Sequence, residues 1–130
     1  MNRINTYDIR PIPHENHRYV GTVGDYWDEG MLTEVRISQL GDARMEFCVM
    51  IHELIEEFLC KQRGISEVDQ IKPFDEDFER NRKPGDISEP GHDPLAPYHK
   101  EHVFAEKIEM QIAEEIGLDW AEYTDRVNAL

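Results

Sequence analysis

Two segments of the chain carry apolar residues at the three- and four-residue spacing of an amphipathic helix. They span residues 43–63 and about 97–116. Asp42 precedes the first segment as a helix-capping side chain, and a glycine follows each segment, as is typical of helix C-termini. The pattern predicts two long helices. Their apolar faces are expected at Phe47, Ile51, Leu54 and Phe58, and at Val103, Phe104, Ile108, Ile112 and Ile116.

The N-terminal third alternates apolar and polar residues, which is the period of a β-strand. The clearest run is residues 32–40, and a shorter candidate at residues 7–10 is expected to end at Pro11. The order of elements predicts an α+β fold, in which a small antiparallel sheet from this third packs against the two long helices. A short C-terminal helix follows at residues 120–128, and one domain is expected to span residues 1–130.

The region between the two long helices is expected to hold a shorter helix and a long loop. Residues 66–69 have the polar side chains that begin a helix, which we expect to run to about Asn81 with a kink at Pro73. Residues 83–97 are rich in proline and glycine, and a loop of this length often has a function. A simple surface connection would have the same composition, so both interpretations stay open.

The composition is strongly acidic. The chain has 28 acidic and 14 basic residues, which give a net charge of −14. Proteins that hold a nucleic-acid backbone present a basic surface, so direct nucleic-acid binding is not expected. An acidic surface instead suits the binding of cations or of a basic protein partner.

The hydrophobic segments and the cysteines indicate where the protein resides. The longest apolar run, residues 47–51, is far shorter than the roughly 20 residues of a membrane helix, and residues 1–10 contain no signal segment. Cys48 and Cys60 lie on one expected helix, with a separation of about 18 Å that excludes a disulfide. Two reduced thiols and no export signal predict a cytoplasmic protein that does not enter a membrane.

The candidate functional residues are histidines and glutamates at helical spacing. His52 and Glu56 lie four positions apart in the first long helix, and His102 and Glu106 repeat that spacing in the second. His99 shares the face of His102, because positions three and seven apart fall on one side of a helix. If the two helices pack side by side, the five residues form one cluster.

A cluster of imidazole and carboxylate groups among apolar residues has two explanations. It can bind a divalent transition metal; zinc is the first expectation, and manganese or iron accept the same donors. A carboxylate-rich set could hold two ions. The cluster can also be a hydrogen-bonded network that ties the helices together. We favour the metal, because burying these groups is costly unless they are paired or bind an ion.

Glu53 is the candidate catalytic residue. It directly follows a candidate ligand, as the general base does in His-Glu-x-x-His metallopeptidases of the zincin type. In such enzymes the metal lowers the pKa of a water molecule, and the carboxylate accepts its proton. The strand just upstream would present a substrate-binding edge. This chain departs from that motif, because Glu56 stands where the second histidine belongs.

Three stretches of the sequence, residues 52–56, 60–65 and 93–105, resemble a family of short proteins that bacteriophage and prophage genomes encode. The resemblance runs from about Asp25 to Leu130. It implies an intracellular phage or bacterial setting, and it implies no catalytic assignment, because no activity is established for that family.

Three functions are therefore compatible with the sequence. The first is a metal-dependent hydrolase, with peptides as the first substrate class. The second is a helical nucleotide pyrophosphatase, although histidines are poor ligands for the magnesium that such enzymes use. The third is a non-enzymatic acidic phage protein that binds a basic host protein, in which the cluster is structural.

Overall fold

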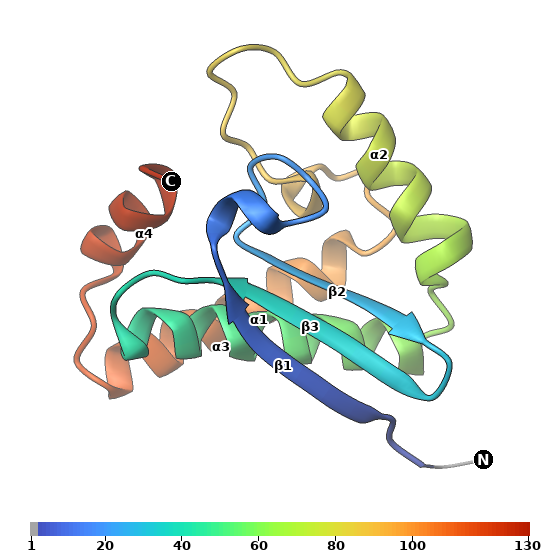
Figure 1. The fold of residues 1–130 in the computed structure, drawn as a ribbon, viewed down its shortest axis with the longest axis horizontal. Coiled ribbons are helices and arrows are strands. Elements are labelled where there is room, and N and C mark those ends of the chain that lie inside the picture. The colour runs from blue at the N-terminus through green and yellow to red at the C-terminus, as the bar shows by residue number, and fades with distance from the viewer. Residues whose placement is uncertain (1–2) are drawn as a thin grey trace.

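The N-terminal third forms a three-stranded sheet in the computed structural model, which describes residues 3–130. The strands are β1 (Thr6–Ile12), β2 (Gly24–Glu29) and β3 (Leu32–Ser38), in the order β1-β3-β2 (Figure 1). β2 pairs antiparallel with β3, whereas β1 pairs parallel with it. The α+β class is confirmed, but the prediction of an antiparallel sheet is wrong, because the sheet is mixed.

The connection between the first two strands explains the mixed sheet. Residues 13–23 reverse the chain direction, but they leave β1 and β2 one strand apart. The short turn after β2 then places β3 in that gap, where it runs in the direction of β1. Pro11 lies inside β1, opposite Ile37, and does not end the strand as expected. An edge strand tolerates proline, because it has a neighbour on one side only.

The ends of two helices follow the local sequence. α1 (Ala43–Gln62) begins after Asp42, whose side chain accepts a hydrogen bond from the backbone of the first turn. It ends before Gly64, whose φ of +69° is a conformation that glycine adopts without strain. α4 (Trp120–Asn128) begins in the same way at Asp119. The predicted boundaries of these two helices are confirmed.

The segment between α1 and the last long helix differs in detail from the expectation. It starts with a π-helical turn at Glu67–Ile71, which continues into α2 (Lys72–Arg80). Pro73 lies in the first turn of α2, where its missing N–H is not needed, so it begins the helix and does not kink it. A loop with one 3-10 turn, Pro90–His92, then leads to α3 (His99–Glu115).

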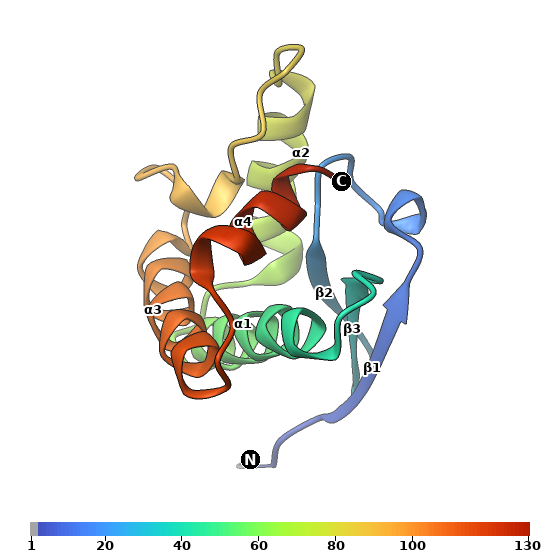
Figure 2. The ribbon, with the colours of Figure 1, turned by 90° about the vertical axis from the view of Figure 1, so that its left-hand side faces the viewer.

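The central position of α1 decides which residues are buried. Figure 2 shows α1 between the sheet and α3, so α1 has two buried sides. The face predicted to be buried is only partly buried: Phe47 and Phe58 are about 40% exposed, whereas Leu54 packs against the core. The buried side chains of α1 are a mixed set: Met45, Cys48, Val49, His52, Glu53, Glu56, Glu57 and Cys60.

The same correction applies to α3. Val103 and Phe104 are exposed, while the side that faces α1 buries two alanines and three polar residues: Glu101, His102, Ala105, Glu109 and Ala113. The interface between the two long helices is therefore rich in carboxylate and imidazole groups. No helix within residues 3–130 combines the length and the apolar composition that crossing a membrane requires.

Candidate metal centre

Two histidines and one glutamate meet inside the protein, between α1 and α3. His52 Nε2 lies 3.1 Å from His102 Nδ1 and 3.1 Å from Glu56 Oε2. His102 Nδ1 lies 2.8 Å from the same glutamate oxygen. The three side chains are at most 7% exposed. Three potential ligand atoms thus form a nearly equilateral triangle, away from bulk solvent.

The dimensions of this triangle fit the coordination of a small divalent ion. Donor atoms at about 2.0–2.1 Å from a tetrahedral zinc ion are roughly 3.3 Å apart. The observed separations of 2.8 to 3.1 Å differ from that value by a few tenths of an ångström. A three-residue set of imidazole and carboxylate groups also leaves one tetrahedral position open, which is typical of catalytic zinc sites.

A second carboxylate orients the ring of His52. Glu109 Oε1 lies 2.7 Å from His52 Nδ1, and the Tyr123 hydroxyl donates to Glu109 Oε2 at 2.6 Å. A carboxylate behind one ring nitrogen directs the lone pair of the other nitrogen toward the ligand position. The other oxygen of Glu56 is fixed in a similar way, by the hydroxyl of Tyr26 at 2.9 Å. Both residues of α1 are therefore held in place by neighbouring elements.

In the absence of a metal, protons hold this cluster together. Burial opposes charge on His52, but hydrogen bonds with Glu109 and Glu56 raise its pKa well above the usual value. Burial likewise opposes charge on His102, whereas the carboxylates of Glu56 and Glu89 raise its pKa to about 10. Burial would raise the pKa of Glu56, yet the hydrogen bonds from the two histidines lower it to about 2. A metal ion would have to displace these protons.

Glu53, the candidate catalytic residue, lies inside the protein. It follows His52 in α1, and its side chain is only 8% exposed. It lies against β2, where a Cβ atom on Gly24 would come within 2.5 Å of Glu53 Oε1. Burial and the neighbouring charge of Glu56 raise the pKa of this carboxyl well above its usual value. Only a glycine at position 24 leaves room for it.

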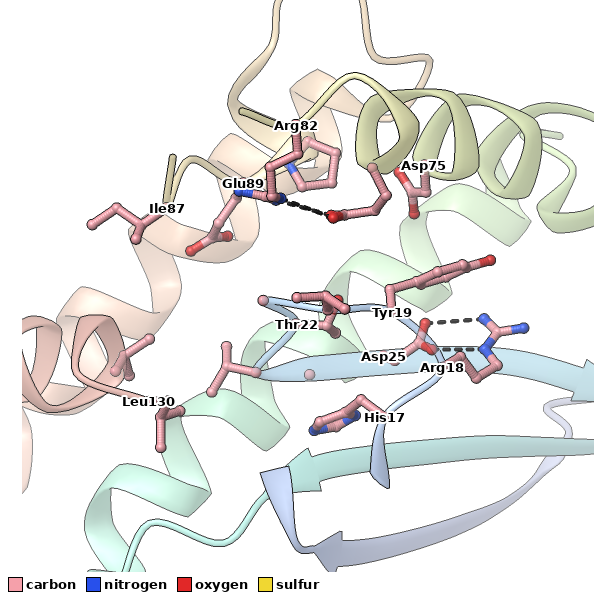
Figure 3. A pocket seen from close by; sticks show the side chains of 18 of the residues that line it. His17, Arg18, Tyr19, Thr22, Asp25, Asp75, Arg82, Ile87, Glu89 and Leu130 are labelled. Atoms are coloured by element: carbon pink, nitrogen blue, oxygen red, sulfur yellow. Dashed lines mark hydrogen bonds and ion pairs between the residues drawn. The ribbon is translucent and has the colours of Figure 1, made fainter. Parts of the chain in front are cut away.

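A cavity of about 1140 Å³ opens beside the cluster, and its walls include Glu53, Glu56 and His102. Figure 3 shows its two sides: Asp25, which pairs with Arg18, lies on one side, and Asp75 and Arg82 lie on the other. Two of the three ligand residues, Glu56 and His102, thus border one space with the candidate base, and that space is large enough for a substrate.

Two of the five predicted ligands lie elsewhere. His99 Nδ1 is 2.9 Å from the backbone oxygen of Gly91, which anchors the loop before α3. Glu106 bonds to His92 at 2.6 Å, and its side chain is about one-third exposed. The structure therefore brings together His52, Glu56 and His102, but neither His99 nor Glu106 joins them.

Several residues of the site are absent from the sequence-based expectation. Glu109, seven positions after His102, has the spacing that would have placed it on the same face. Tyr26 and Tyr123 come from β2 and α4, and no local pattern connects them with the two long helices. Glu89 lies in the long loop, and only the position of that loop over α3 brings it to the cluster.

The parallel with zincin peptidases loses one element. β3, the strand directly before α1, has a neighbour on both sides and offers no free edge to a peptide.

Compared with protein-family models, curated proteins and solved structures, the chain matches none of them. The resemblance to phage-encoded proteins stays a prediction.

Proposed function

We propose that this protein binds one divalent transition metal ion, zinc in the first place, through His52, Glu56 and His102, and that it is a metal-dependent hydrolase. The observation behind the proposal is the convergence of three buried ligand atoms within 2.8 to 3.1 Å of one another. Two neutral imidazoles and one carboxylate are ordinary zinc ligands, and manganese or iron accept the same donors.

The roles of the residues follow from their positions. When bound, the ion supplies Lewis-acid activation of water. Glu109 accepts a hydrogen bond from Nδ1 of His52 and so keeps the ring proton there. Nε2 then carries the lone pair that ligates the ion. Glu53 is the proton acceptor of the proposed reaction, because its carboxyl borders the same cavity as Glu56 and His102. The buried position of the cluster excludes bulk water from the ligand atoms.

Metal analysis tests the first half of the proposal. Untagged native protein, dialysed against zinc and then against metal-free buffer, is expected to retain at least one ion per chain. A His52→Ala/His102→Ala variant is expected to retain none at these three residues. The matched control is a His14→Ala/His17→Ala variant, whose rings bond to Ser38 and not to the cluster. Native protein without metal after this treatment would contradict the proposal.

A Glu53→Gln variant tests the second half. It is expected to keep the metal content of the native protein and to hydrolyse substrate at least about 100-fold more slowly, because a glutamine cannot accept the proton. Rates are measured on the substrate that the native protein hydrolyses in a panel of peptides, phosphate esters and nucleotides. Equal rates for variant and native protein would show that Glu53 is not the proton acceptor.

The setting of the proposed activity is the cytoplasm of a bacterial or phage-infected cell. Two buried, unpaired thiols, Cys48 and Cys60, support a reducing compartment. If the native protein binds no metal, the alternative is a non-enzymatic role. A net charge of −14 then favours a search for a basic host protein, whose binding would weaken as the salt concentration rises.

A further inference from the structure

The second nitrogen of the His102 ring has no use in the site described above. Nδ1 faces Glu56 and His52, whereas Nε2 points to the other side of the ring. Nε2 is buried and, within residues 3–130, makes no well-formed hydrogen bond, although it forms an ion pair with Glu89. Glu89 Oε2 lies 3.3 Å from it, and His102 as a whole is 4% exposed. A buried ring nitrogen without a well-formed hydrogen bond is costly, so a stronger interaction is expected at this position.

A second set of ligand atoms surrounds this nitrogen. Each of Glu89, His92 and His102 offers one ligand atom within 4.8 Å of the other two. The His92 ring meets the His102 ring edge to face, with the centroids 4.7 Å apart. The set repeats the composition of the first one, with two imidazoles and one carboxylate.

The support behind the second set also repeats that of the first. Glu109 lies behind His52 at 2.7 Å, and Glu106 lies behind His92 Nε2 at 2.6 Å. If the ring proton of His92 lies on Nε2 and is donated to Glu106, Nδ1 carries the lone pair that can ligate a metal ion. Nε2 has this role in His52.

The loop before α3 is built to lie against the His102 ring. A Cβ atom on Gly91 would come within 2.4 Å of two atoms of that ring, so only glycine allows this approach. His99 holds the carbonyl oxygen of Gly91 at 2.9 Å. This contact places Glu89 and His92, on either side of the glycine, next to Nε2.

We infer that the His102 imidazole bridges two divalent metal ions. Nδ1 ligates the ion that His52 and Glu56 hold, and Nε2 ligates a second ion together with Glu89 and His92. The second ion replaces the ring proton on Nε2, which leaves the protein as the ion binds. This inference rests on the proposed function, because it requires an ion in the first site.

The second ion would be the more accessible of the two. The side chains of Glu89 and His92 are 44% and 47% exposed, whereas those of the first site are buried. Glu89 also borders the large cavity. An ion held there has open coordination positions, which suits the binding of an anionic or carbonyl oxygen of a substrate.

Zinc stoichiometry tests this inference. Native protein dialysed at a fixed free zinc concentration is expected to bind two ions per chain. A Glu89→Gln/His92→Gln variant is expected to bind one ion. Because the two substituted side chains are about half exposed, the variant should keep its fold, and circular dichroism checks this. The matched control is Asp93→Asn in the same loop, which removes a charge but keeps the acceptor for the backbone N–H of Leu95. It is expected to bind two ions.

Copper(II) then tests the bridge itself. An imidazolate between two copper ions couples their spins, so the electron paramagnetic resonance signal of the doubly loaded native protein should integrate to far less than two spins per chain. The singly loaded variant should give one full spin. Two bound ions with two full spins would overturn the bridge. One ion in both native protein and variant would overturn the second site and leave the first, whereas no ion would overturn the proposed function itself.

Discussion

Glutamine in place of Glu56 is expected to lower the affinity for zinc by at least about 100-fold. Among residues 3–130, the Oε2 atom of Glu56 is the only anionic atom that lies within 3.1 Å of both Nε2 of His52 and Nδ1 of His102. An amide of the same shape carries no charge and is a weak ligand. Loss of a residue that merely supports a ligand costs 10- to 100-fold in affinity, so loss of a ligand should cost no less than the upper end. Competition with a chromophoric chelator measures the change.

The residue next to it provides a matched control. Glu57 is as buried as Glu56, but its carboxylate accepts a hydrogen bond from Tyr7 and contacts neither histidine. Glu57→Gln makes the same chemical change one position along α1, and zinc affinity should stay within about threefold of the native value. If both variants lose affinity equally, the effect belongs to the fold of α1. If neither does, the three residues do not bind zinc.

The second large effect is a loss of stability of the metal-free protein as the pH rises. His52 and His102 have raised pKa values in the folded state, about 10 for His102, against an ordinary value of 6.5. Their contribution is therefore complete below pH 6.5 and is lost as the pH rises toward 10. Asp75 acts in the same direction over a lower range, because burial raises its pKa from 3.8 to about 7, so its contribution is lost as the pH rises from 3.8 through 7.

At low pH the stability contribution of Glu56 has the opposite pH dependence. The pKa of Glu56 falls from 4.5 to about 2 in the folded state, so its contribution is present above pH 4.5 and is lost as the pH falls toward 2. The combined contribution of the two histidines and Glu56 should be largest between about pH 4.5 and 6.5. Between pH 6 and 9 its free energy of unfolding should fall by roughly 3 kcal/mol, since one pKa unit corresponds to about 1.4 kcal/mol.

Urea unfolding in the presence of a chelator measures this dependence. The same series with saturating zinc is the control, because an ion binds the deprotonated histidines and gains affinity as the pH rises. The loss of stability above pH 6.5 should then shrink or reverse. A metal-free protein with equal stability at pH 6 and pH 9 would show that the histidines are not held as cations in the folded cluster.

Local features of the fold are predictable from the sequence. Asp42, Gly64 and Asp119 mark helix ends through interactions with the nearest turn, and such short-range interactions act in the same way in any tertiary context. The pairing of β1 with β3 is different. It depends on how a long connection closes, and nothing in the residues of β1 distinguishes a parallel from an antiparallel neighbour.

The inward side of the long helices is also beyond the reach of a periodicity argument. Phe47, Phe58 and Phe104 form a regular apolar pattern, yet they are 40–45% exposed, and the buried positions between the helices hold histidines and glutamates. A hydrophobic pattern identifies the buried side of a helix only where burial is driven by apolar contact. Here hydrogen bonds and charge compensate the burial of polar groups.

The candidate site illustrates the same limit. The pairing of His52 with Glu56 and the approach of His102 are predictable, because helical spacing aligns the first two and side-by-side packing supplies the third. Glu106 and Glu109 are both compatible with that spacing, and only the rotation of α3 about its axis determines that Glu109 reaches His52.

The separation of the ligands along the chain has a consequence for the entropy of the protein. Glu56 and His102 are 46 positions apart, and they lie on opposite sides of the α1–α3 interface. A bound ion therefore acts as a cross-link that closes a long loop. By the loop-closure relation for disulfides, a cross-link that closes a loop of this length lowers the conformational entropy of the unfolded chain, which stabilises the folded state by roughly 4 kcal/mol. An ion between α1 and α3 would give this cysteine-poor chain the kind of covalent-like constraint that secreted proteins obtain from disulfides.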